Sequence, residues 1–338
     1  MQKNKTTIHD ISKALNIDSS TVSRALNNSS RVSKKTKEKI EKKANELGYK
    51  RNSLASNLRT NKTNTIAVIV PRISRNFFSS VISGIEETAY KASYNVIICQ
   101  SLDSLEREVK LMGTLLANRV DGILISISME TTNYDHLRAY LSHGAPIVFF
   151  DRPCSLDNCS NVSIDDYKAS FEATEHLISK KRKYIVHLSG PQEIELYRNR
   201  KNGYLDALKK HNIELNDDYC IESNLTEKDG IVSAKKILDL KNVDGIYSAN
   251  DTSAISAIQY LKSKGIIIPK DIAVVGFNND SISAVIEPSL TTVNQPDFEM
   301  GNISADLLLE QIQEKSTITK NKSILLNSEL IIRNSTTI

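Results

Sequence analysis

The sequence predicts an α/β protein in which a small helical head precedes a larger body built from two lobes of parallel β-sheet. From Thr65 onward, short runs of β-branched and aliphatic residues alternate with amphipathic helical patterns, which is typical of parallel sheets covered by helices. The tetrapeptide Val-Asp-Gly-Ile occurs at 120–123 and again at 243–246, and each copy begins a strand-like run. Residues 1–62 lack such runs and are strongly basic. The contrast between head and body and the repeat within the body therefore indicate three structural units.

The head and the body differ in charge. Residues 1–62 contain 15 Lys and Arg against 5 Asp and Glu, a net charge of +10, whereas the whole chain carries only +4. The body is therefore mildly acidic, and a basic head on an acidic body is expected to meet a polyanion. Tyr49 is the only aromatic residue of the head, so the stacked aromatic side chains typical of single-strand binders are missing. Double-stranded DNA is the predicted partner.

Two short helices joined by a tight turn are predicted at the start of the head. Thr7 and Asp10 have the spacing of a capping box, with Asp in place of Glu, and they open the first helix. Asn16 ends it, because Asn tolerates the left-handed conformation that a tight turn needs. Asp18 or Ser19 then caps the second helix. The residues expected to face inward are Ile8, Ile11, Ala14, Leu15, Val22, Ala25 and Leu26.

The second and third helices present polar and basic side chains outward. The second helix is predicted over Ser20–Asn27, and the third runs from its cap Ser33 to Leu47 and stops at Gly48. A helix, a tight turn and a second helix with small polar residues at its start is the layout that enters a major groove. A three-helix knob with a solvated basic face has the same pattern, so the spacing alone leaves both interpretations open.

The segment LASNLRTN at 54–61 is ambiguous when taken alone. Leu54, Ala55 and Leu58 would share one face of a helix, but the stretch is shorter than the roughly 12–15 residues that make an isolated helix marginal in water. Taken alone, the segment favours a linker with two incidental apolar residues.

Several classes of protein are disfavoured by simple absences. No run approaches the ~20 apolar residues of a membrane span, and the start MQKNKTTIHD lacks the apolar core of a signal peptide, so we expect a cytoplasmic protein with no membrane contact. The four cysteines are scattered and none lies in a CxxC, so neither a disulfide framework nor a zinc site is expected. No P-loop, GxSxG or HExxH motif occurs. The chain is therefore predicted to be no enzyme and to hold no catalytic residue, cofactor or metal.

The body is expected to alternate strands and helices. The predicted strands are Ile66–Val70, Val96–Cys99, Gly122–Ile125, Ile147–Phe150, Tyr184–Leu188, Gly245–Ser248 and Ile272–Gly276. The predicted helices are Phe77–Ala92, Leu105–Asn118, Tyr167–Ser179, Arg200–Lys210, Ser253–Lys264 and Glu299–Ile312. Gly84-Ile85 and Gly203-Tyr204 repeat with nearly the same offset as the Val-Asp-Gly-Ile pair. Two similar α/β lobes would flank a ligand cleft lined by loops at the carboxyl ends of their strands.

The chain resembles the lactose-repressor (LacI/GalR) family of bacterial transcription factors over essentially all of residues 6–338. In the head the resemblance lies in Thr21–Asn27, TVSRALN, and in Gly48-Tyr49. In the body it lies in Asp151-Arg152-Pro153, Ser248–Asp251, Val274–Asn278 and Pro288–Pro296. The resemblance implies a helix-turn-helix head, a hinge helix and a two-lobed body like that of periplasmic binding proteins. It also implies a ligand-responsive regulator, most often a repressor, that binds a palindromic operator as a homodimer.

The resemblance assigns DNA-binding roles by position. Ser19, Ser20 and Arg24 would approach base edges, while Thr21 and Ser23 would support phosphate contacts. Asp18 departs from the family's usual Ser at the cap. The hinge helix would bring Ala55 and Leu58 to the minor groove, where Leu58 matches a leucine that wedges into a central base step and bends the duplex by some 20–90°.

The resemblance also divides the chain and assigns a cleft. It implies a head at 1–50, a hinge at 51–62, lobe 1 at 63–162 with 293–323, and lobe 2 at 163–292 with 324–338. The effector-binding residues carried over are Phe78, Asp151, Asp165, Arg200 and Asp251. Carboxylates and a guanidinium bind hydroxyl pairs while an aromatic ring covers an apolar face, so a sugar or sugar derivative is the expected effector.

Departures from the family pattern qualify the expected ligand and assembly. Arg75-Asn76 replaces a common Asn-Pro, and Arg198 and Arg152 add further cations, which favours an acidic or phosphorylated ligand. A nucleobase is the leading alternative effector. A periplasmic solute receptor is the alternative class of protein, but it would need a signal peptide and would not carry this head. Only three residues follow Ser335, too few for the heptad helix of tetrameric relatives, so a dimer is expected.

Overall fold

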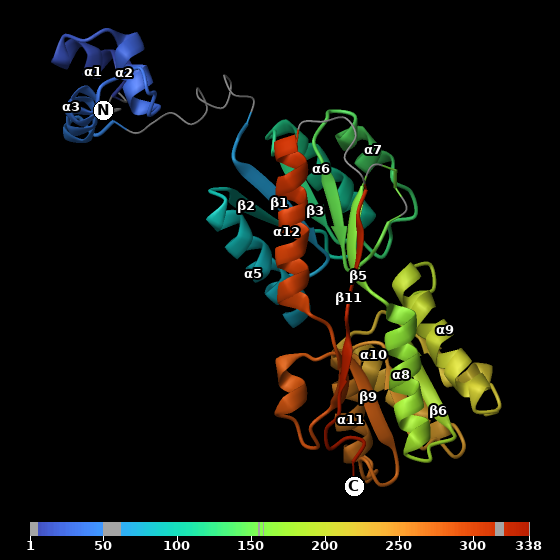
Figure 1. The fold of residues 1–338 in the computed structure, drawn as a ribbon. Coiled ribbons are helices and arrows are strands. Elements are labelled where there is room, and N and C mark those ends of the chain that lie inside the picture. Colours follow the sequence, from blue (N-terminus) through green and yellow to red (C-terminus); the bar gives the residue numbers. More distant parts are fainter. Residues whose placement is uncertain (1–5, 50–61, 155, 158, 315–320, 338) are drawn as a thin grey trace. The chain divides into compact units, whose positions relative to one another are not determined.

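The computed structural model describes residues 6–49, 62–154, 156–157, 159–314 and 321–337 (Figure 1). The chain divides into two compact units, residues 1–63 and 64–338, which correspond to the head and the body and are described separately. The helical head and the two-lobed α/β body agree with the fold class predicted from the sequence.

The head consists of three helices, α1 (Ile8–Leu15), α2 (Ser19–Leu26) and α3 (Lys34–Glu46). The predicted capping box is present, because the backbone N–H of Thr7 donates to the Asp10 carboxylate over 2.8 Å. Asn16 ends α1 in the left-handed conformation, with φ of 52°, as its residue type indicated. The helix α2 begins and ends one residue earlier than predicted, since the carbonyl oxygen of Asp18 already accepts from the N–H of Val22.

A small apolar core holds the three helices together. Its fully enclosed members are Ile11, Val22, Ala25, Ile40 and Ala44. Ala14, which was expected to face inward, is exposed on the flank of α1, and Leu47, directly after α3, is also 38% exposed. Three short helices cover only a narrow face of each other, so residues at the margin of each apolar stripe stay in contact with water.

Lobe 1 contains a six-stranded parallel sheet in the order β11-β5-β4-β3-β1-β2. Its strands are β1 (Thr65–Val70), β2 (Asn95–Gln100), β3 (Gly122–Ile125), β4 (Ile147–Phe150), β5 (Ser160–Ile164) and β11 (Ser323–Leu326). Its helices are α5 (Asn76–Lys91), α6 (Leu105–Ala117), α7 (Asp135–Leu141) and α12 (Asp297–Glu314). Strands β1, β3 and β4 are almost wholly buried, which explains their continuous apolar sequences.

Lobe 2 repeats this arrangement in the order β12-β10-β9-β8-β6-β7, with only the β10–β12 pair antiparallel. Its strands are β6 (Ile185–Ser189), β7 (Cys220–Glu222), β8 (Gly245–Ser248), β9 (Ala273–Asn278), β10 (Thr291–Asn294) and β12 (Glu329–Ile331). Its helices are α8 (Asp166–Ser179), α9 (Glu195–Lys210), α10 (Glu227–Asp239) and α11 (Asp251–Ser263), with 3-10 turns η1 (Asp217–Tyr219) and η2 (Ser281–Ala284).

The sequence repeats occupy equivalent places in the two lobes. Asp121 and Asp244 both accept backbone N–H groups near the start of the first strand of their lobe, from Asn64 and from Tyr184 respectively. Gly84 on α5 allows the backbone of α12 to approach closely, because a Cβ there would collide with the carbonyl oxygen of Phe298 (Figure 1). Gly203 on α9 does the same against α8. The repeated glycines therefore set the helix packing of each lobe.

Three segments connect the lobes, and each strand before a crossing extends past the boundary expected from the sequence. The ladders keep β5 in lobe 1 as far as Ile164, β10 in lobe 2 as far as Asn294, and β11 in lobe 1 as far as Leu326. The predicted boundaries fell two or three residues earlier, at 162, 292 and 323. No Gly or Pro follows closely on the ends of β5 and β11, whereas Pro296 lies two residues after the end of β10, so the hydrogen-bonded ladder is needed to locate the first two.

Candidate functional site

The head exposes the outer face of α2. Ser20 and Arg24 are exposed, while Ser19, Thr21 and Ser23 are half-buried. The hydroxyl of Ser19 lies 3.0 Å from Nδ1 of His9 on α1, so a contact between the two helices orients the start of α2. His9 was not among the site residues predicted from the sequence. The residues expected to read DNA therefore lie along one short helix whose opposite side forms the core of the head.

The outer face of α3 adds positive charge. Its exposed or half-exposed lysines are Lys34, Lys35, Lys37, Lys39, Lys42 and Lys43. Lys43 pairs with Glu46 at 2.6 Å, and Lys37 donates to the carbonyl oxygen of Asn28, which ties α3 to the loop after α2. The predicted hinge residues Ala55 and Leu58 lie outside the described residues, and their roles stay predictions.

In the body, the carboxyl ends of strands from both lobes meet around a cavity of about 60 Å³. Lobe 1 contributes Pro71, Arg72, Arg75, Phe77, Phe78, Asp103, Met129, Asp151 and Arg152. Lobe 2 contributes Leu196, Tyr197, Arg200, Ala249, Asn250 and Asn278, and Gln295 lies at the crossing after β10. Ligand pockets usually measure roughly 300–1,000 Å³, so a sugar-sized molecule requires the lobes or side chains to move apart.

Several residues of this cleft adopt backbone conformations that are rare for side chains other than glycine. Asp103 follows β2 with φ of 61°, Asp151 follows β4 with φ of 64°, and Asn278 ends β9 with φ of 109°. All three line the cavity. Such conformations cost free energy and persist where the surrounding structure imposes them, often at ligand sites.

Arg200 is anchored inside lobe 2. Its guanidinium donates from Nε to Oδ1 of Asp166 over 2.7 Å and from Nη1 to the carbonyl oxygen of Ala249 over 2.8 Å. It also lies 3.6 Å from the centre of the Phe277 ring. Burial raises the pKa of Asp166 to about 6, although the adjacent guanidinium favours the ionised carboxylate. Arg200 therefore reaches the cavity as a positioned cation that already has a carboxylate partner.

Asp165 was predicted to bind the effector, but the carboxylate that pairs with Arg200 is its neighbour Asp166. Asp165 is exposed and caps α8 by accepting from the N–H of Lys168 over 2.9 Å. It is not among the residues that line the cavity. Asp166, one position later, points inward. The sequence offered two adjacent aspartates at a helix start, and no local signal separates the capping residue from the buried one.

Asp151 and Arg152 line the lobe 1 side of the cavity. Asp151 accepts from the hydroxyl of Ser126 over 3.0 Å, and burial raises the pKa of its carboxyl. Arg152 donates from Nη1 to Asp103 over 2.9 Å and to the carbonyl oxygen of Ile127 over 2.6 Å. Phe78, also predicted, is buried and lines the same cavity. The structure thus brings Phe78 and Asp151 together with Arg200.

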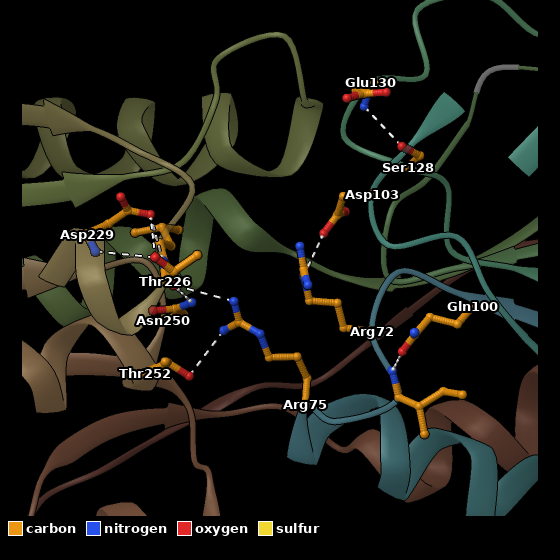
Figure 2. A network of polar contacts seen from close by, with 12 residues as sticks. Arg72, Arg75, Gln100, Asp103, Ser128, Glu130, Thr226, Asp229, Asn250 and Thr252 are labelled. Carbon is orange, nitrogen blue, oxygen red and sulfur yellow. Dashed lines mark hydrogen bonds and ion pairs between the residues drawn. The ribbon is translucent and has the colours of Figure 1, made fainter. Parts of the chain in front are cut away.

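Figure 2 shows that Arg75 reaches from lobe 1 to lobe 2. Its guanidinium donates from Nη1 to the hydroxyl of Thr252 over 3.1 Å and from Nη2 to the carbonyl oxygen of Leu225 over 3.5 Å. Arg72 turns to lobe 1 instead, where its Nε lies 3.4 Å from Oδ2 of Asp103 (Figure 2). Arg75 is therefore a direct polar link between the two lobes.

Asp251 lies behind the cavity wall and not on it. Its Oδ1 accepts from the hydroxyl of Thr292 over 2.7 Å, and its Oδ2 accepts from the hydroxyl of Ser283 and the N–H of Asp280 over 2.6 and 2.8 Å. Burial raises the pKa of its carboxyl to about 7. Asn250, which the sequence analysis did not single out, lines the cavity in its place. In this arrangement of the lobes, Asp251 connects α11 to η2 and β10.

Two family models account for nearly all of the chain. One, described as periplasmic binding proteins and sugar binding domain of LacI family, matches residues 63–333, and the other, described as bacterial regulatory proteins, lacI family, matches residues 7–52. The chain belongs to the LacI family of bacterial regulatory proteins. The resemblance of its motifs to that family, noted from the sequence, is confirmed.

Similar LacI-family proteins include regulators and solved structures. The NTD biosynthesis operon regulator NtdR of Bacillus subtilis is 33% identical over 98% of this chain and 99% of its own length. The repressor CytR of Escherichia coli is 31% identical over 99% of this chain and 97% of its own. A cellobiose complex of the transcriptional regulator CelR has 27% identity, covers 98% of this chain and 100% of that one, and gives a TM-score of 0.74. The lac repressor dimer bound to operator and an anti-inducer has 24% identity, covers 98% and 99% of the two chains, and shares the fold with a TM-score of 0.85.

Membership of the LacI family gives each unit a general role. The head is a DNA-binding helix-turn-helix unit, and the body is a ligand-binding unit of a transcriptional regulator. Within the described parts of the chain, each helix is too short or too polar to span a lipid bilayer. Among the same residues, no three His, Cys, Asp or Glu side chains are grouped so that they could hold a metal ion.

Proposed function

We propose that this LacI-family protein is a repressor that binds a palindromic operator as a homodimer and releases or tightens its hold when a sugar-like effector enters the interlobe cleft. It would act on chromosomal DNA in the cytoplasm and would perform no catalysis. The observation that carries the proposal is the combination, in one chain, of a basic head exposing Ser20 and Arg24 with a polar cavity between two lobes. A solute receptor has no use for such a head.

The cleft supports a polyol ligand. Phe78 and Tyr197 offer ring surfaces, and the amide of Asn278 can exchange hydrogen bonds with hydroxyl groups, whereas the amide of Asn250 already donates to the Leu225 carbonyl oxygen and accepts from the N–H of Ser253. The structure of the regulator CelR is a complex with cellobiose, and a LacI transcriptional regulator that is 31% identical to this chain was solved with D-xylulofuranose bound. A nucleobase is the alternative effector, and the relatives include the transcriptional repressor PurR of Vibrio atlanticus.

A dimer is supported by the free edge of the lobe 1 sheet. Strand β2 ends that sheet and has no partner on its outer side among the described residues. Ile97 and Ile98 on β2 are 38% and 46% exposed, and Tyr90 at the end of α5 is 77% exposed. Proteins usually protect edge strands with charge or cover them. We infer that a second copy of this chain covers this edge, which would bring two heads to one operator.

The effector can act only through the angle between the lobes. A ligand changes operator affinity to the extent that it binds one lobe arrangement more tightly than another. The lobes approach each other at Arg75, Thr252 and Leu225 in the present arrangement. A larger ligand would have to separate these groups, and the change of angle would be passed to the segments that precede β1 in the two subunits.

Selection of a binding sequence from random duplexes, followed by anisotropy titration, tests the DNA-binding part. We expect a palindromic site, and Arg24→Ala should weaken binding to it by about tenfold or more because a base contact is lost. Lys110→Ala on the surface of α6 in the body is the matched control and should bind like the parent. Failure to select any palindrome would contradict the proposal.

A thermal-shift screen tests the effector part. Neutral sugars, sugar phosphates, uronates and purines are compared, because a ligand at 100 times its Kd adds about 2.7 kcal/mol to the free energy of unfolding. The best ligand is then added to the operator titration. A ligand that binds the body but leaves operator affinity unchanged would refute effector control.

A further inference from the structure

Three arginines crowd one end of the cleft. Arg72, Arg75 and Arg152 all line the cavity on the lobe 1 side. Among the described residues, their ion-pair partners are Asp103, which both Arg72 and Arg152 contact, and Asp151, which lies 3.9 Å from Nε of Arg152. Two carboxylates thus serve three guanidinium groups.

Among the described residues, Arg75 has no ion-pair partner, and one donor of Arg152 has no hydrogen-bond acceptor. Arg75 donates only to neutral groups, the Thr252 hydroxyl and the Leu225 carbonyl oxygen, and forms no ion pair with a described carboxylate. Arg75 lowers the pKa of Asp280, which burial raises, but the two groups form no ion pair within 4 Å, so the guanidinium of Arg75 has no carboxylate in direct contact among the described residues. Arg152 is only 5% exposed, and its Nε has no hydrogen-bond partner among the described groups. A buried donor without an acceptor is costly.

We propose that the effector carries a carboxylate or phosphate group, and that Arg72, Arg75 and Arg152 bind it. The proposal rests on the proposed function, in which this cleft is the effector site. Guanidinium groups bind both anions through paired, charge-assisted hydrogen bonds. The anion supplies the missing negative charge, and it gives Nε of Arg152 an acceptor. The remainder of the effector lies toward Phe78, Tyr197 and Asn250.

The position of the anion follows from the partners already present. Arg200 holds Asp166 at 2.7 Å and the Ala249 carbonyl oxygen at 2.8 Å, so its donors toward lobe 2 are occupied. Arg75 and Arg72 have weaker partners, at 3.1–3.5 Å. An incoming anion therefore replaces the partners of Arg75 at lower cost than those of Arg200.

This placement couples anion binding to the lobes. Arg75 holds lobe 2 through Thr252 and Leu225, and the cavity of about 60 Å³ accommodates only a few atoms. An anionic group that takes over the guanidinium of Arg75 removes a direct interlobe contact. A neutral sugar can offer Arg75 only hydroxyl groups, which bind a guanidinium no more strongly than the Thr252 hydroxyl does already.

Titration with inorganic phosphate tests the proposal without knowledge of the natural effector. In phosphate-free buffer at fixed ionic strength, isothermal titration of the full-length protein should give a Kd on the order of 1 mM. Arg75→Asn should weaken binding roughly 10- to 100-fold, because a charged hydrogen-bond partner is lost. No binding at about 50 times that concentration, or equal binding by parent and variant, overturns the proposal.

Two further variants make the result specific. Arg72→Gln replaces a side chain that is 40% exposed, so it should fold and should also weaken phosphate binding, even if Arg75→Asn does not fold. Arg138→Gln is the matched control, because Arg138 pairs with Asp135 on the exposed surface of α7, outside the cleft. It should bind phosphate like the parent, and an equal loss in Arg138→Gln would show that phosphate binds elsewhere.

Three ligands on one scaffold identify the source of the anion. Glucose, glucuronate and glucose 6-phosphate are compared by thermal shift. At least one of the two acids should stabilise the parent more than glucose does and should lose that advantage in Arg75→Asn. A larger response to glucuronate assigns a carboxylate, and a larger response to glucose 6-phosphate assigns a phosphate. If neither acid exceeds glucose, the proposal fails. Operator binding by the parent is measured separately, so failure of the anion inference and failure of the proposed function give different results.

Discussion

Replacing Asp251 with Asn removes a fully buried carboxyl group that accepts hydrogen bonds from Thr292, Ser283 and the backbone of Asp280. Burial raises the pKa of this carboxyl from 3.8 to about 7, and the hydrogen bonds offset only part of that rise. A carboxyl with a higher pKa in the folded state binds its proton more tightly when the protein is folded. Its contribution to stability is therefore fully present below pH 3.8 and is lost as the pH rises to about 7.

The size of the effect follows from the two pKa values. Each unit of pKa difference corresponds to about 1.36 kcal/mol of unfolding free energy. More than half of the total loss falls between pH 5 and pH 8, because the folded-state pKa lies within this range. The parent should therefore lose about 2–3 kcal/mol of unfolding free energy relative to Asp251→Asn across that range. The variant has no proton to lose at this position. The difference between the two proteins isolates Asp251 from other groups that titrate, such as Asp166.

Urea unfolding of parent and Asp251→Asn at pH 5, 6, 7 and 8 measures this difference. A constant difference, or a parent that gains stability as the pH rises, would refute the reasoning, since it would mean that the three donors keep Asp251 ionised in the folded state. The same variant tests the role inferred from the family resemblance. If it loses the ligand found by screening while its stability keeps the pH dependence of the parent, Asp251 faces the effector and not the lobe interior.

Three other substitutions test separate parts of the molecule. Asp166→Ala should lower the free energy of unfolding, measured in urea, by about 3–5 kcal/mol, because Arg200 stays buried without its partner. The neighbouring variant Asp165→Ala, which removes only the cap of α8, should lower it by about 1 kcal/mol. Equal losses would contradict the assignment of Asp166 as the partner of Arg200. Ile98→Lys places a charge on the exposed edge of β2 and should shift a dimer to monomer in sedimentation velocity, and an unchanged dimer would locate the interface elsewhere. Leu58→Ala should weaken operator binding and reduce DNA bending in a circular-permutation gel while ligand affinity stays the same, and unchanged bending would exclude the wedge role.

Local sequence determined much of the fold. The capping box at Thr7 and Asp10 and the cap at Ser33 involve partners three residues away, so the sequence alone predicts them. Strands β3, β4 and β8 were predicted with their observed bounds because both faces are buried and the apolar run is continuous. Strands β5, β7, β10 and β11 were missed, since polar residues interrupt or flank their apolar residues and leave no continuous apolar run.

The sequence by itself also determined the charge division and, through its motifs, the family, because these depend on which residues are present and in what order. Only the tertiary structure decided which residues reach the cleft. Asp165 and Asp166 are adjacent, yet one caps a helix and the other pairs with Arg200. Asp251 accepts hydrogen bonds from residues 29, 32 and 41 positions away, and Arg75 donates to residues 150 and 177 positions away. The direction of a polar side chain depends on which donors and acceptors the packed chain places around it, and those come from segments that no local pattern brings together.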